Sequence, residues 1–200
     1  MKRTVLAILA AAVALFVWGF ISWTLLPWHN GQMKRFTDEK AVAAVIKANS
    51  PEPGLYLLPG CPPDKSASAR EAQMKAMGEG PYLYGVARSG SKDVAMGPYM
   101  ATNLLSNIVI ATLLALLMSR MPCAGWSCRV KLGAVIGLLA GFVADVPTAI
   151  WFEFPILPTL AIIADHIIAC ILAALVIGAV SGCKVSCESR APAPAAGPNG

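Results

Sequence analysis

Four long runs of apolar residues constrain the fold of this chain more than any other feature of its sequence. They cover Val5 to Leu26, Gly97 to Ser119, Leu132 to Trp151 and Pro158 to Gly182. Each run is long enough to cross about 30 Å of hydrocarbon as a helix that rises about 1.5 Å per residue. Only 14% of the 200 residues are charged, whereas about a quarter would be charged in a soluble domain. The sequence therefore predicts an all-α membrane fold, a four-helix transmembrane bundle.

Lysine and arginine in the short segments predict the orientation of the spans. The hairpin between the third and fourth runs has neither residue type, and its aromatic residues suit a membrane interface. Basic residues are enriched on the cytoplasmic side, so we expect a bacterial inner-membrane protein with both termini in the cytoplasm. The basic residues that flank the spans are Lys2, Arg3, Arg120, Arg129, Lys131, Lys184 and Arg190.

The first run is longer than the apolar region of a secretory signal, which has about 7 to 15 residues. We therefore expect an uncleaved anchor, and the small residues from Ala10 to Ala14 leave cleavage as the alternative. The proline- and alanine-rich tail is expected to be disordered. The expected units are a first span (1–27), an extracytoplasmic cap (28–96), a second span (97–119), a cytoplasmic loop (120–131), a third span (132–151), an outer hairpin (152–157), a fourth span (158–182) and the tail (183–200).

The long segment after the first span is expected to form a small α+β cap outside the membrane. A helix is predicted from Phe36 to Asn49, with Thr37 able to cap its first turn, and a second from Ser66 to Met77. Strands are predicted at Gly54 to Leu58 and Tyr82 to Val86. Such a unit is too small to be very stable alone, so we expect it to rest on the outer ends of the spans. Alternatively, its tyrosines and leucines form a partner surface.

Small residues recur every four positions in the last two spans and predict close helix packing. Such spacing forms a groove that lets two helix backbones approach each other. The simplest interpretation is that the two grooves face each other inside one chain. The alternative is contact with a membrane-protein partner or with a second copy. The residues are Gly133, Gly137 and Gly141 in the third span and Ala174, Gly178 and Gly182 in the fourth.

Polar residues inside the spans form the candidate site. Ionisable groups at membrane depth are costly, so each is a functional hypothesis. A site for a proton, an ion or a small ligand is one interpretation, and structural hydrogen bonding between helices is the other. Adjacent residues on a helix point about 100° apart, so Asp165 and His166 cannot both face one spot. The candidates, with His29 nearby, are Asn103, Asn107, Asp145, Asp165 and His166.

Four of the six cysteines lie on the predicted cytoplasmic face, where thiols stay reduced. Two pairs on one face are able to form a zinc or iron–sulfur site, although their C-x4-C and C-x3-C spacings are looser than usual. Free thiols are the other interpretation and need no cofactor. Cys61, alone on the outer side, is not expected to form an internal disulfide. The four are Cys123, Cys128, Cys183 and Cys187.

Short motifs give the chain a family resemblance. They are the segments 18–23 (Trp-Gly-Phe-Ile-Ser-Trp), 26–29 (Leu-Pro-Trp-His) and 52–60, and Phe154-Pro155 leading to Asp165. With them the chain resembles, up to about Gly182, a group of small bacterial membrane proteins with four predicted spans. No activity is established for that group, so the resemblance implies the topology and no mechanism.

The pattern as a whole favours a structural or accessory membrane protein that binds a partner through its helices or its cap. No metalloprotease, nucleophile-elbow, Walker or Rossmann motif appears, so no enzyme is predicted. No basic stripe interleaved with aromatic residues predicts a nucleic-acid partner. The alternatives are the intramembrane polar site and the cysteine site on the cytoplasmic face.

Overall fold

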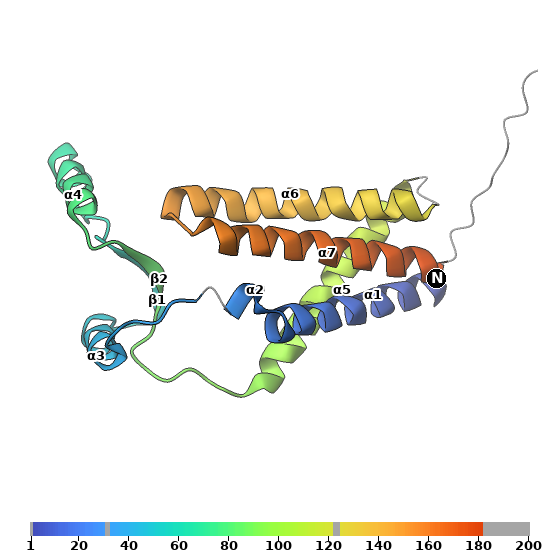
Figure 1. Cartoon of the computed structure of the whole chain (residues 1–200), viewed down its shortest axis with the longest axis horizontal. Coiled ribbons are helices and arrows are strands. Elements are labelled where there is room, and N and C mark those ends of the chain that lie inside the picture. Colours follow the sequence, from blue (N-terminus) through green and yellow to red (C-terminus); the bar gives the residue numbers. More distant parts are fainter. Residues whose placement is uncertain (1, 31–32, 122–124, 182–200) are drawn as a thin grey trace, which may run out of the picture.

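The computed structural model describes residues 2–30, 33–121 and 125–181 (Figure 1). The chain is mostly helical and carries one two-stranded sheet between its first and second long helices. Its elements, in chain order, are α1 (Lys2–Phe20), the π-helix η1 (Ile21–Leu25), α2 (Pro27–Asn30), α3 (Glu39–Asn49), β1 (Gly54–Leu58), α4 (Ala67–Glu79), β2 (Leu83–Ala87), α5 (Met96–Arg120), α6 (Trp126–Phe152) and α7 (Ile156–Ser181).

Four helices within the described residues are long and apolar enough to cross a membrane: α1 with η1, α5, α6 and α7. They coincide with the four predicted runs, and their ends differ by a few residues. The largest difference is at α6, which begins at Trp126 although residues 120–131 were expected to form a loop. Charged side chains do not end a helix, because their long stems let the charge reach water from the last turn. The length of the uncharged run therefore underestimates the length of the helix.

Helix α7 is the central element of the bundle. It packs along α6 on one side and along α1 on another, and it also touches α5 and α2 (Figure 1). The main core lies between α1, α5 and α7 and is rich in alanine, which lets helices approach closely. Its buried members are Ala11, Ala12, Leu15, Ala111, Leu114, Ala115, Ala173, Ala174 and Ile177.

The first long helix does not end as a regular α-helix. It widens into η1, and the N–H of Leu26 donates to the carbonyl oxygen of Ile21 at 3.1 Å, five residues back. Leu26 is extended because the following Pro27 disfavours helical geometry at the residue before it. Pro27 then begins α2, where its missing N–H carries no cost. This short reversal positions Trp28 and His29.

The cap contains the predicted helices and strands in the predicted order. Strands β1 and β2 are antiparallel, with Leu55 opposite Val86 and Leu57 opposite Tyr84. Helix α3 is capped by Asp38 and not by Thr37, because the N–H of Ala41 donates to Asp38 Oδ1 at 2.9 Å. Aspartate is also among the preferred capping residues, and here it is the one next to the first helical turn.

The second cap helix begins at a similar side-chain cap. The N–H of Ala69 donates to Ser66 Oγ at 3.2 Å, so Ser66 is the cap of α4. The hydroxyl and the N–H of Ser66 both donate to Asp64, and these hydrogen bonds lower the pKa of that carboxyl. Ionised Asp64 therefore fixes the turn that precedes α4.

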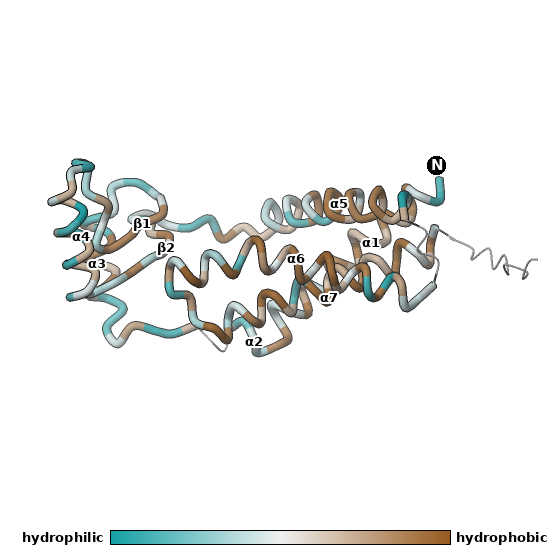
Figure 2. The backbone as a smooth tube through the Cα atoms, turned by 90° about the horizontal axis from the view of Figure 1, so that it is seen from above, coloured by the Kyte–Doolittle hydropathy of each residue, from teal (hydrophilic) through white to brown (hydrophobic). Residues whose placement is uncertain are grey.

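The cap contacts the bundle through aromatic side chains at the hairpin between α6 and α7. The ring of Tyr84 stacks on Phe152 with centroids 3.8 Å apart, and it meets Phe154 edge-on at 6.0 Å. Neither α3 nor α4 has a buried residue. Figure 1 shows both helices at the far end of the molecule, and Figure 2 shows hydrophilic colours gathered there and apolar colours along the long helices.

We expect Tyr84→Ala to loosen the cap without unfolding the bundle. A stacked aromatic pair contributes about 0.5–1.5 kcal/mol beyond burial, so amide exchange in β2 should accelerate about two- to tenfold. Hydrogen–deuterium exchange of residues 83–87 measures this. Tyr82→Ala is the matched control, since Tyr82 is exposed just before β2. Equal exchange rates in the two variants would show that the aromatic contact does not hold the cap.

Candidate functional site

Asp165 on α7 is the centre of a polar network at the cap-side end of α1. Its Oδ1 accepts a hydrogen bond from the indole Nε1 of Trp18 at 2.6 Å. Its Oδ2 lies 3.8 Å from Nε2 of His29. The side chains of Asp165 and His29 are 15% and 4% exposed, so the pair is largely shielded. Asp165 therefore joins α7 to both α1 and α2.

The end of α1 and the short α2 hold His29 in place. His29 Nε2 lies 3.1 Å from the hydroxyl of Ser22, which is fully buried. The indole Nε1 of Trp28 donates to the Ser22 hydroxyl at 3.0 Å and to its carbonyl oxygen at 3.2 Å. The ring of Trp23 stacks on His29 with centroids 4.0 Å apart and planes 5° apart. The π-helix and the reversal at Pro27 bring these groups together.

The tautomer of His29 decides which way its hydrogen bonds run. If Nε2 carries a proton, it donates toward the Ser22 hydroxyl and faces the Asp165 carboxylate. If Nε2 is unprotonated, the Ser22 hydroxyl donates to it. A protonated imidazole beside the Asp165 carboxylate forms an ion pair.

A second acid–imidazole pair lies between α6 and α7. His166 Nε2 is 3.2 Å from Asp145 Oδ2, and the two side chains are 41% and 22% exposed. Asp145 Oδ2 is buried but accepts no hydrogen bond of good geometry. Asp165 and His166 are adjacent on α7 and, as helix geometry requires, face different neighbours: α1 and α2 for Asp165, α6 for His166.

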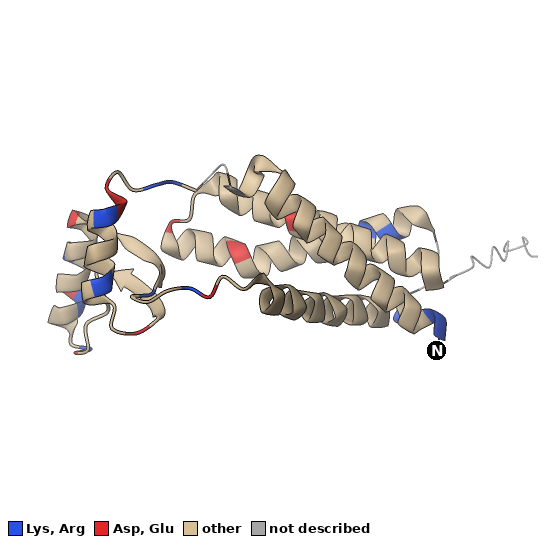
Figure 3. Ribbon diagram, turned by 90° about the horizontal axis from the view of Figure 1, so that it is seen from below, with Lys and Arg blue, Asp and Glu red and all other residues tan. Residues whose placement is uncertain are grey.

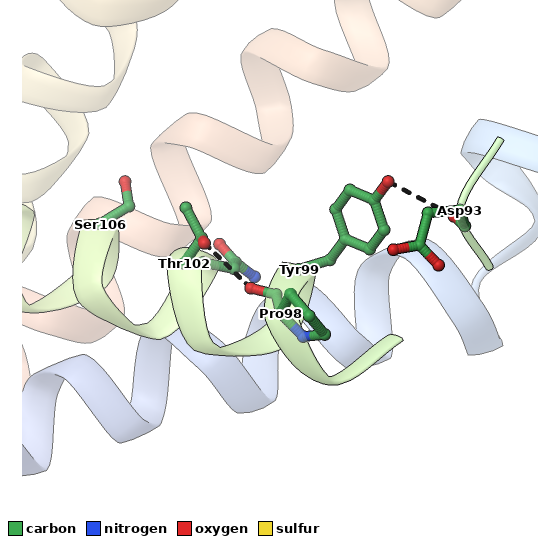
Figure 4. Close-up of a pocket in the computed structure, with 6 residues that line it drawn as sticks. Asp93, Pro98, Tyr99, Thr102 and Ser106 are labelled. Atoms are coloured by element: carbon green, nitrogen blue, oxygen red, sulfur yellow. Dashed lines mark hydrogen bonds between the residues drawn. The ribbon is translucent and has the colours of Figure 1, made fainter. Parts of the chain in front are cut away.

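The two asparagines lie on α5. Asn107 is buried, with 8% of its surface exposed. Asn103 lines an open groove of about 580 Å³ along the cap-side end of α5 (Figure 4). In it the hydroxyl of Thr102 donates to the Pro98 carbonyl at 2.9 Å, and the hydroxyl of Tyr99 lies 3.4 Å from the Asp93 carbonyl. All residues that line this groove come from α5 and the segment before it. The five candidates therefore do not converge: Asp145 pairs with His166, Asp165 pairs with His29, and the two asparagines lie apart from both pairs on α5.

The three glycines of α6 lie against the backbone of α7, and all three are buried. A Cβ added at Gly137 would lie 2.5 Å from Ile167 Cα and 2.5 Å from the His166 carbonyl oxygen. One added at Gly133 would lie 2.6 Å from Ile171 Cα, and one at Gly141 would lie 2.9 Å from a side-chain carbon of Ile163. No side chain fits at these positions unless the helices move apart.

The small residues of α7 have other neighbours. Ala174 is fully buried in the core with α1 and α5, Gly178 meets the side chain of Arg129, and Gly182 lies outside the described residues. The antiparallel register explains this arrangement. Because Gly133 lies opposite Ile171, positions after Ile171 on α7 lie opposite the start of α6, where Arg129 is. The two small-residue stripes therefore do not lie directly opposite each other.

Only one of the four cysteines proposed as metal ligands lies within the described residues. Cys128 is disulfide-bonded, and so is not the free thiol that a reducing compartment predicts. Cys123, Cys183 and Cys187 lie outside the described residues, so a four-cysteine zinc or iron–sulfur site stays a prediction. Within the described part of the chain, no three His, Cys, Asp or Glu side chains are grouped as metal ligands would be. Cys61 and Cys170 are free.

Sequence reasoning did not assign Trp18, Ser22, Trp23 and Trp28 to the site. One sequence signal was available for the first two. Trp18 and Ser22 are four residues apart and thus share a face near the end of the first span, just before His29. Their link to Asp165 spans 147 residues of sequence, which no local pattern predicts.

Comparison of the chain with protein-family models, curated proteins and solved structures finds no match. The resemblance to small four-span bacterial membrane proteins therefore stays a prediction.

We expect Trp18→Phe to destabilise the protein, because it leaves the Asp165 carboxylate without its shortest hydrogen bond. Loss of a partner to a buried charged group costs about 1–3 kcal/mol. Thermal unfolding in detergent, followed by circular dichroism, measures the loss. Trp151→Phe is the matched control, since Trp151 is 79% exposed. Equal melting temperatures for the two variants would mean that the Trp18–Asp165 bond does not stabilise the fold.

We expect Gly137→Ala to force α6 away from α7, because the added Cβ would overlap backbone atoms. Overpacking of this kind typically costs about 1–3 kcal/mol. Gly97→Ala is the control, since an added Cβ there meets nothing within 4 Å. The melting temperatures of both variants, measured in the same detergent, test this prediction. A Gly137→Ala protein as stable as the control would contradict the close approach of the helices.

Proposed function

We propose that the chain is an integral protein of the bacterial inner membrane, with both termini in the cytoplasm and the cap outside. The four long apolar helices support a multi-pass protein. The basic residues of the long helices support the orientation. Figure 3 shows them at the end of the bundle far from the cap, where the positive-inside rule expects the cytoplasm.

Within the membrane, the proposed role is that of an accessory protein whose bundle carries a cap that binds a partner protein. The observation that supports this is the apolar surface of the cap. Leu55 and Val86 lie opposite each other on one face of the sheet and are 62% and 83% exposed. On the helices, Val45 and Met74 are also largely exposed. Exposed apolar side chains that lie next to each other, as Leu55 and Val86 do, are typical of protein–protein contact sites.

The polar network around Asp165 is consistent with an accessory role, because its hydrogen bonds need no catalytic or transport function to explain them. Its carboxylate accepts a hydrogen bond from Trp18, and the buried Ser22 and His29 contact each other. Such bonds join helices in membrane proteins, where each is worth about 0.6 to 2 kcal/mol. A network with these partners is explained by the packing of α1 and α2 on α7.

A second candidate function is the handling of a proton, an ion or a small ligand at the acid–imidazole pairs. The observation that favours it is that both histidines of the chain lie beside a carboxylate of a long apolar helix. Imidazole changes charge near neutral pH, so such pairs are able to relay protons. This function requires Asp145 and Asp165, whereas an accessory function tolerates Asp165→Asn once the fold is intact.

We expect Val86→Lys to reduce recovery of a stoichiometric partner at least tenfold when the full chain is purified in gentle detergent. A lysine places a hydrated charge in the apolar contact surface. Val94→Lys is the matched control, because Val94 is equally exposed at 83% but precedes α5 outside the sheet. Mass spectrometry of both preparations and of the Asp165→Asn protein gives the readout.

Partner recovery that is absent from the unmodified protein, or unchanged by Val86→Lys, would contradict the accessory function. Proton-flux measurements on Asp145→Asn and Asp165→Asn variants in vesicles would then test the second candidate.

A further inference from the structure

The two acid–imidazole pairs of the bundle differ in how well the chain itself shields them. The His29–Asp165 pair is 4% and 15% exposed and is joined by Trp18 and Ser22. The Asp145–His166 pair, between α6 and α7, is 22% and 41% exposed. Asp145, Asp165 and His166 lie in α6 and α7, which are long and apolar enough to cross a membrane, whereas His29 lies on the short α2.

In the membrane location proposed above, Asp145 and His166 lie deep in the hydrocarbon, so their exposure to lipid costs free energy. Asp145 is seven residues from the end of α6, and His166 ten residues from the start of α7, which is about 10 to 15 Å along each helix. Long helices extend about 5 Å beyond the hydrocarbon at each end, so both side chains lie within it. Polar groups at this depth normally face the protein interior or one another.

The surroundings of the pair resemble a helix contact surface. Leu138, Phe142 and Asp145 lie at helical spacings of four and three residues and so share one face of α6. Leu138 and Phe142 are 44% and 55% exposed. Of α6, only Gly133, Gly137 and Gly141 are buried, and these face α7. The α6–α7 hairpin therefore presents a face that is apolar around a polar centre.

We propose that a second copy of the chain covers this face, forming a two-fold dimer centred on Asp145 and His166. A two-fold axis brings the same patch of both copies together, so the patch must be complementary to itself. An acid beside an imidazole meets this condition, because each copy offers both an acceptor and a donor, and the donor of one copy can face the acceptor of the other.

The chemistry of the proposed contact follows from the pair within one copy. His166 faces Asp145 through Nε2, and a protonated imidazole also donates from Nδ1. In the dimer, Nδ1 of each His166 donates to the Asp145 carboxylate of the other copy. The four groups then alternate in charge around the axis. Asp145 Oδ2 is buried beside His166 of its own chain, so the donor of the other copy meets the other oxygen of the carboxylate.

The test uses the full chain, expressed with two different affinity tags and purified in mild detergent. The unmodified protein is expected to have the molecular mass of two copies by light scattering, and one tag is expected to recover the other. Asp145→Asn should weaken this recovery about tenfold, because hydrogen bonds between the helices are lost at two symmetric places; a tenfold change corresponds to about 1.4 kcal/mol in total. Thr102→Val, which removes a polar group from the exposed face of α5, should leave it unchanged.

A charge exchange distinguishes the proposed contact from general destabilisation. The double variant Asp145→His with His166→Asp stays complementary to itself and should recover to within about twofold of the unmodified protein. If its melting temperature shows that it does not fold, co-expression of Asp145→Asn with His166→Asn chains replaces it. Mixed dimers retain one crossed pair and should form more readily than either variant forms with itself.

Three results would overturn the proposal. The first is an unmodified protein that is monomeric in detergent and in lipid nanodiscs. The second is Asp145→Asn recovery equal to that of the unmodified protein. The third is a folded double variant, or a mixed pair, that associates no better than the single variants. A complex of one copy of the chain with a different protein bound to α6 would overturn the proposal in the same way as the first result.

Discussion

The close approach of α6 to α7 is the contact on which the rest of the bundle depends. At Gly133 and Gly137 the two backbones meet with no room for a side chain. In the membrane proposed for this protein, lipid provides no hydrophobic drive between helices, so the contact area gained by close packing must supply the attraction. This contact fixes α7, which in turn provides the surface on which α1 and α2 pack, and α5 packs mainly on α1. A helix as exposed as α6 is held almost entirely by its glycine face.

Polar contacts then select one arrangement of α1 on that surface. The core of alanine and leucine side chains between α1, α5 and α7 tolerates small displacements along the helix axes, because such contacts are not directional. The hydrogen bond from Trp18 to Asp165 is directional and only 2.6 Å long. Together with the contact of His29 on the same carboxylate, it fixes both the depth and the rotation of α1. The π-helix at Ile21–Leu25 is the local distortion that brings His29 into reach.

The parts of the fold predicted from sequence are those that depend on local composition. Apolar run length predicts the four long helices, because the requirement of each span is local. The flanking prolines predict β1 at its observed bounds, Gly54 to Leu58, and the helix predicted from Ser66 to Met77 differs from α4 (Ala67–Glu79) by one residue at its start and two at its end. The extension of α6 back to Trp126 was not predicted, since Arg129 and Lys131 end an uncharged run but not a helix.

The candidate site was predictable only in its components. Asp145, Asp165 and His166 stand out because ionisable residues are rare in apolar helices. Their partners depend on helix register and rotation, which spacing alone does not determine. Small-residue spacing predicted that the last two helices pack closely, but the register places Ile163, Ile167 and Ile171 opposite the α6 glycines. The same register places Gly178 beside Arg129.

The contrast between the two acid–imidazole pairs follows from the position of α7 in the bundle. Residues that follow one another on a helix point about 100° apart, so a central helix sends Asp165 and His166 toward different neighbours. Asp165 faces α1 and α2, which supply the indole N–H of Trp18 and shield the carboxylate. His166 faces α6, which lies at the edge and supplies only Asp145. One pair is thus shielded within the chain, and the other has a side that the chain does not cover. Because of this difference in shielding, the His29–Asp165 pair joins helices within the chain, and the Asp145–His166 pair is the stronger candidate for contact with another molecule.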